Sequence, residues 1–137
     1  MTPLEMMENW LRQFPRWENG TVWIDSTDGI PGNTGLFPQG ITEVSRKEDV
    51  TGRTQSLCRM VFDLVFVRAG EQDGKENAQW LLQLQEWIRQ ESANAPEFGD
   101  DARSQRIWAQ QGKLRKVYQT GTAHYGVTVT VEFLKYD

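Results

Sequence analysis

Apolar residues recur every three or four positions in two segments, and this spacing predicts two helices. The first segment is Thr2–Phe14, where Pro3 suits the first helical turn and Pro15 cannot continue the helix. The second segment is Lys75–Glu91. Each helix is expected to bury one apolar stripe. The stripes consist of Leu4, Met7, Leu11 and Phe14 in the first helix, and of Trp80, Leu81, Leu84, Trp87 and Ile88 in the second.

Alternation of apolar residues with other types predicts strands, most clearly over Leu57–Arg68 and Tyr125–Lys135. Three further strands are predicted at Thr21–Ile24, Leu36–Val44 and Lys113–Gln119, and the last of these is expected to form a hairpin with the final strand. The predicted inward faces of the two clearest strands consist of Cys58, Met60, Phe62, Leu64 and Phe66, and of Tyr125, Val127, Val129, Val131 and Phe133.

Polar and glycine-rich segments separate these elements. Turns or loops are predicted at Asp25–Gly35, Ser45–Gly52, Ala69–Gly74 and Thr120–Thr122. The polar segment 92–112 is long for a passive connection and contains large apolar side chains, so it is predicted to be an interaction loop.

Consecutive strands without crossover helices predict a largely antiparallel sheet. The expected architecture is a single α+β domain over residues 1–137, with two main helices packed on one face of the sheet.

Composition excludes several classes of protein. No apolar run approaches the roughly 20 residues that a membrane helix needs, and no secretory signal is recognised. The net charge of -4 argues against a dedicated nucleic-acid binder. A single cysteine, Cys58, excludes an internal disulfide and favours a reducing cytoplasm. The single histidine, His124, leaves few metal sites or nucleophile–base pairs, so no metal, cofactor or catalytic residue is predicted.

Two groups of charged residues remain as candidates for contacts. Asp25 and Asp28 lie in a glycine-rich loop, but their spacing does not fit a calcium loop, and turn chemistry explains both. A basic group surrounds Trp108 and includes Arg103 and Arg106. Trp and Arg are the residue types that dominate protein–protein contacts. We therefore predict that Asp25, Asp28, Arg103, Arg106 and Trp108 lie in protein interfaces.

Three stretches resemble small minor capsid or tail-completion proteins of long-tailed phages and prophages. They are Arg59–Arg68, with the sequence RMVFDLVFVR; Asn77–Trp87, with NAQWLLQLQEW; and Gly121–Phe133, with GTAHYGVTVTVEF. The order of predicted elements over residues 1–137 also fits these proteins. The resemblance implies an α+β structural protein of the virion, without catalysis, cofactor or metal, that assembles in the cytoplasm of the bacterial host.

Within that family the resemblance is to tail terminators. It implies a homo-oligomeric ring, usually a hexamer, that caps the tail tube and helps join it to the head. The implied partners are further copies of the chain, the tail tube protein and the head connector protein. No membrane is implied, and DNA would pass only as cargo.

Two alternatives stay open at this point. One, in the same class, is a minor capsid or head-completion protein. The other is a small cytoplasmic enzyme or ligand-binding domain that uses Asp25, Asp28 and His124, and it predicts a concave polar pocket near those residues.

We expect the substitution Trp108→Ala to leave the fold intact while weakening self-association or docking, because an interface tryptophan contributes mainly to binding. Circular dichroism with sedimentation velocity tests this. An unfolded Trp108→Ala variant would instead place Trp108 in the core.

Overall fold

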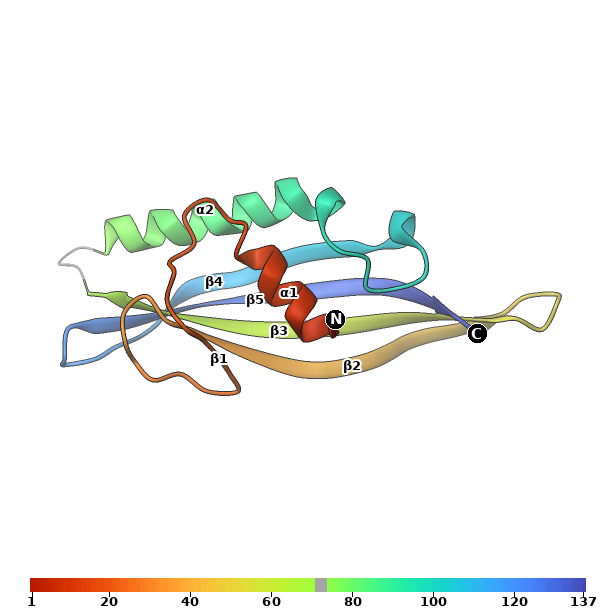
Figure 1. Cartoon of the computed structure of the whole chain (residues 1–137), viewed down its shortest axis with the longest axis horizontal. Helices are drawn as coiled ribbons and strands as arrows, with labels where there is room; N and C mark the ends of the chain where they lie inside the picture. Colours follow the sequence, from red (N-terminus) through yellow and green to blue (C-terminus); the bar gives the residue numbers. More distant parts are fainter. Residues whose placement is uncertain (71–73) are drawn as a thin grey trace.

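The computed structural model describes residues 1–70 and 74–137, so part of the turn predicted over 69–74 lies outside the described residues. The chain forms a single α+β domain (Figure 1). In chain order, its elements are α1 (Pro3–Leu11), β1 (Val22–Ile24), β2 (Thr34–Glu48), β3 (Thr54–Ala69), α2 (Lys75–Glu91), two 3-10 turns (Ser92–Asn94 and Ala102–Ser104), β4 (Arg106–Val117) and β5 (Thr122–Tyr136).

The strands form one sheet in the order β1-β2-β3-β5-β4. Strand β1 runs parallel to β2, and the other neighbours are antiparallel, as the pattern predicted. The central pair β3 and β5 keeps a continuous register from Gln55 opposite Tyr136 to Ala69 opposite Thr122. This order leaves β1 at one edge of the sheet and β4 at the other.

Both helices lie on the same face of the sheet, where they share one core with its inward side chains. Helix α1 contributes Met7, Trp10 and Leu11, which are all buried. Its Trp10 ring contacts Trp87 of α2, with the ring centroids 5.1 Å apart. The predicted inward faces of β3 and β5 are buried, except that Cys58 is only partly covered. The expectation of two helices on one face is therefore confirmed.

The prediction of one long loop over 92–112 is wrong, because β4 begins at Arg106. Arg106 and Trp108 belong to this strand, whereas Arg103 lies in the 3-10 turn before it. The polar character of residues 106–112, which include two glutamines and Gly112, favours a loop when the sequence is considered alone. An edge strand tolerates such residues, since pairing with β5 supplies its backbone partners. The polar residues fall at a bulge between Gln110 and Lys113.

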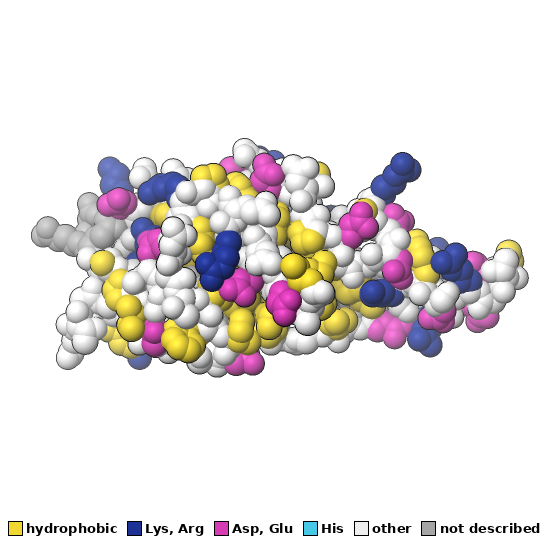
Figure 2. Space-filling view, viewed as in Figure 1, with side chains coloured by type: hydrophobic (Ala, Val, Ile, Leu, Met, Phe, Trp, Pro, Cys, Tyr) yellow, Lys and Arg dark blue, Asp and Glu magenta, His cyan; other side chains and the backbone are white. Residues whose placement is uncertain are grey.

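Tertiary pairing also lengthens β2, β3 and β5 beyond their predicted ranges, whereas β1 is one residue shorter than predicted. Strand β2 continues to Glu48, so the connection to β3 shortens to a turn at 49–53. There the Asp49 carboxylate accepts hydrogen bonds from the backbone N–H groups of Thr51 and Arg53. The hairpin of β2 and β3 extends past the helices as an arm, and side chains of both charges cover it (Figures 1 and 2).

Candidate functional site

The predicted interface residues lie on opposite edges of the sheet. Asp25 and Asp28 lie in the loop between β1 and β2, at the first edge. Arg106 and Trp108 lie on β4, at the last edge, and Arg103 immediately precedes it. The structure thus brings Arg106 and Trp108 together on one strand and separates both from the two aspartates. We name residues 22–33 the acidic edge. We name β4, with the part of α2 that lies beside it, the basic edge.

The acidic edge is organised by Asp28. Its carboxylate accepts hydrogen bonds from the Trp23 indole N–H at 2.9 Å, from the Ile30 backbone N–H at 3.0 Å and from the Asn33 side-chain amide at 2.9 Å. The bond from Ile30, with those from Asn33 and Trp23, lowers the pKa of Asp28, so the side chain is anionic at neutral pH. Asp28 therefore holds the loop in shape as well as giving it charge.

Apolar side chains are exposed around these aspartates. The exposed fractions are 42% for Trp23, 39% for Ile24 and 56% for Ile30. Asp25 is exposed between them, with its backbone in the left-handed region at a φ of 59°. Residues 22–33 contain no lysine or arginine. The acidic edge therefore combines negative charge with exposed apolar surface.

The basic edge has the opposite charge. Strand β4 carries four basic residues and no acidic residue, namely Arg106, Lys113, Arg115 and Lys116. Of these, Arg115 is engaged within the chain, because its guanidinium donates two 2.7 Å hydrogen bonds to the Asp63 carboxylate. Its side chain crosses Gly126, where a Cβ atom would lie 1.8 Å from Arg115 Nε. Arg106, Lys113 and Lys116 are exposed.

A groove follows the basic edge between α2 and β4, which lie side by side (Figure 1). It comprises two adjoining hollows of about 330 and 350 Å³, both lined by Leu82 and Gln85 of α2. From β4, Ile107 and Ala109 line the first hollow and Leu114 lines the second. Leu82 is 66% exposed and Leu114 is 45% exposed. The ion pair of Glu86 with Arg89 also lines the first hollow, and Lys113 lines the second. The groove is therefore an apolar surface with a charged border that includes one carboxylate.

The exposure of the apolar residues at both edges is not predicted by the sequence patterns. These patterns predict a loop at Ile30 and regular elements at Leu114 and Leu82, without indicating that the three side chains are exposed. Leu82 does carry a signal, since it lies outside the stripe that α2 buries. The exposure of Ile30 and Leu114 depends on the strand order, which periodicity does not give.

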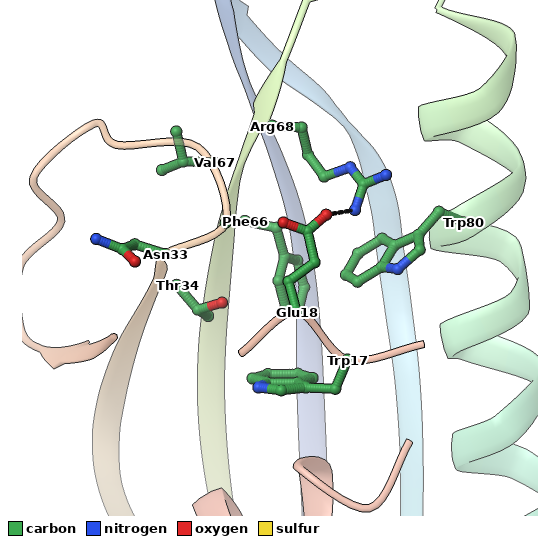
Figure 3. A pocket seen from close by; sticks show the side chains of 9 residues that line it. Trp17, Glu18, Asn33, Thr34, Phe66, Val67, Arg68 and Trp80 are labelled. Carbon is green, nitrogen blue, oxygen red and sulfur yellow. Dashed lines mark hydrogen bonds and ion pairs between the residues drawn. The ribbon is translucent and has the colours of Figure 1, made fainter. Parts of the chain in front are cut away.

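An enclosed hollow lies elsewhere, beneath the segment that follows α1 (Figure 3). Its volume is about 10 Å³, which is space for about one water molecule. Arg68 lies within it, pairs with the Glu18 carboxylate and donates a 2.8 Å hydrogen bond to Asn77 Oδ1. The guanidinium also stacks over the Trp80 ring, 4.5 Å from its centroid. These contacts fasten the segment around residue 18 to β3 and α2.

The residues of the alternative enzyme hypothesis have separate partners. Asp28 is bonded within its own loop, whereas the His124 ring contacts Tyr118, with the centroids 4.6 Å apart. Partial burial, with Lys116 nearby, lowers the pKa of His124, so the ring is neutral at pH 7. The enclosed hollow is lined by Glu18 and Arg68 rather than by these residues.

Over residues 1–70 and 74–137, no group of three or more His, Cys, Asp or Glu side chains is placed to hold a metal ion. Within the same residues, no helix has the length and apolar character needed to cross a bilayer.

No protein-family model matches the chain, and no curated protein matches its sequence.

We expect Arg68→Ala to lower the free energy of unfolding by about 1–3 kcal/mol, because it removes a mostly buried ion pair, a hydrogen bond and a ring contact together. The loss is smaller than for a fully buried pair because the Glu18 side chain is 40% exposed to solvent. Urea titration followed by tryptophan fluorescence measures the loss.

Arg12→Ala is the matched control, since it breaks a surface pair with Glu8 that is one helical turn away. Its effect is expected to stay below about 0.5 kcal/mol. Equal losses for the two variants would show that the Arg68 cluster does not fasten the segment.

Proposed function

We propose that this chain is a structural assembly protein of a long-tailed phage or prophage. In this proposal it acts as a tail terminator or neck component, as a homo-oligomeric ring that caps the tail tube and helps join it to the head. The resemblance of segments 59–68, 77–87 and 121–133 to tail-completion proteins supports this assignment.

One structural observation carries the proposal: the sheet is open, and its two unlike edges lie on opposite sides of the molecule. Strand β1 pairs with residues Thr34–Leu36 of β2, so among the residues that the structure describes β2 has no strand partner on its outer side over most of its length. Unpaired strand edges are surfaces that can pair with another chain. A protein with different contact surfaces on opposite sides associates head to tail, which generates rings when the rotation closes.

The action required of such a ring is steric and adhesive. One face would cover the last ring of the tail tube and so end its growth, while the other face would receive the head connector. No bond is made or broken, so no proton donor, nucleophile or cofactor is needed. Strand β2 offers a second surface for such contacts, since Ile41 and Val44 are exposed on it.

A place on the head side remains the second candidate, because a minor capsid or head-completion protein would use the same open edges. The two functions differ in what is lost without the protein. A terminator limits the length of the tube, whereas a head-completion protein seals or joins the head.

We expect deletion of this gene from the parent phage or prophage to yield overlong tail tubes without heads, because growth of the tube would lack its cap. Negative-stain electron microscopy of the lysate measures the tube length. Supplying the intact gene from a plasmid should restore both normal length and joined heads.

Tubes of normal length beside unjoined or leaking heads would move the protein to the head side. Normal virions in the deletion lysate would contradict both assembly functions.

A further inference from the structure

We propose that the basic edge of one copy binds the acidic edge of a second copy, with the exposed apolar side chains of residues 22–33 seated in the groove between α2 and β4. This inference rests on the proposed self-association and names the surfaces that make it. It predicts one repeated contact between unlike edges rather than a symmetric contact between like edges.

Charge complementarity is the first argument. The acidic edge presents Asp25 and Asp28 and no cation, whereas the basic edge presents Arg106, Lys113 and Lys116 on β4. The one carboxylate that lines the groove, Glu86, is paired with Arg89. Two like edges would place charges of the same sign together, which disfavours that pairing. Two unlike edges would attract each other, and this attraction raises the rate of association at low salt.

Apolar complementarity is the second argument. Trp23, Ile24 and Ile30 project from the acidic edge, and Ile30 is more than half exposed. The groove on the basic edge offers Leu82 and Leu114, which are both exposed. Burial of such surfaces against one another is the main favourable term in association. Both sets are small and bordered by charge, as is typical of a contact with an apolar centre and a polar rim.

The geometry of the sheet is the third argument. Because the strand order puts β1 first and β4 last, the two complementary surfaces of one copy face away from each other. Within one chain, the acidic edge therefore cannot contact the basic edge. Each copy therefore leaves one edge of each kind available, and this is the condition for a ring or an open row of copies.

Disulfide trapping tests the contact in the purified full-length protein. The native thiol is first removed with Cys58→Ser. Ile30→Cys is then mixed with a partner variant that carries Leu82→Cys or Leu114→Cys, because a disulfide forms only where the Cα atoms approach within about 7 Å. Products of mild oxidation are separated on a non-reducing gel. We expect crosslinked dimers in at least one mixture, roughly tenfold above control, because a bound pair holds its thiols at high effective concentration.

Val50→Cys mixed with Leu114→Cys is the matched control, since Val50 lies fully exposed at the turn of the arm and outside both edges. Ile30→Cys alone should also give only control levels, because like edges do not meet. A chain carrying both Ile30→Cys and the productive groove cysteine should give a ladder of oligomers. Trapping at control levels with both Leu82→Cys and Leu114→Cys would overturn the proposal, and so would efficient trapping of Ile30→Cys with itself.

Charge-reversal substitutions on β4 test whether the basic side chains take part in the contact. Lys113→Glu with Lys116→Glu should lower the trapping rate roughly tenfold at low salt. Arg46→Glu with Lys47→Glu makes the same change of charge on the arm and should leave the rate unchanged. If the two double substitutions lowered the trapping rate equally, the effect would come from net charge alone. Lys113 and Lys116 would then not belong to the interface.

Failure of this inference and failure of the proposed function are distinguishable. Overlong tails in the deletion lysate with no edge-to-edge trapping would retain the terminator and move its ring contact to another surface. Trapping between unlike edges with normal virions in the deletion lysate would retain the self-association and reject the tail function.

Discussion

The pairing of β3 with β5 is the constraint on which the rest of the structure depends. Fifteen residue pairs, from Gln55–Tyr136 to Ala69–Thr122, align without a register shift. This alignment places the apolar alternate positions of both strands on one face, where α1 and α2 cover them. A shift of one residue in this pairing would turn the apolar set of one strand away from the helices. Hydrophobic burial on one face therefore fixes the register, and the register fixes which strands lie outermost.

The same arrangement leaves much of the molecule open. The helices cover one face of the sheet, while polar ladders such as Arg115–Asp63 and Arg59–Glu132 lie on the other. Strands β1 and β4 end the sheet without closing it into a barrel. Natural proteins usually blunt or cover such edges. Here β1 is only three residues long, and β4 carries lysines and two bulges, which discourage direct pairing of strands. The proposed contact with a neighbouring copy is therefore made by the charged and apolar side chains of the edges.

Much of this fold could be predicted from the sequence, because its strongest patterns are local. Helix α2 has the predicted bounds, and the inward faces of β3 and β5 follow directly from alternation. The start of β4 could not be predicted, because its polar residues are compatible with a strand only when β5 lies beside them. The candidate interface was predicted in part. Local sequence features indicate Asp25 and Arg106 as candidates for protein contacts. Their placement on opposite edges depends on the strand order, which no local pattern predicts.

Hydrogen exchange at two protein concentrations tests the central claim, which is self-association through unlike edges, without any substitution. At a concentration where copies associate, the account predicts slower exchange in peptides from both 22–33 and 106–117, because contacts with a neighbour exclude water from each edge. Peptides from the 49–53 turn should exchange equally at both concentrations. Slowing at only one edge, or at neither edge, would contradict the account.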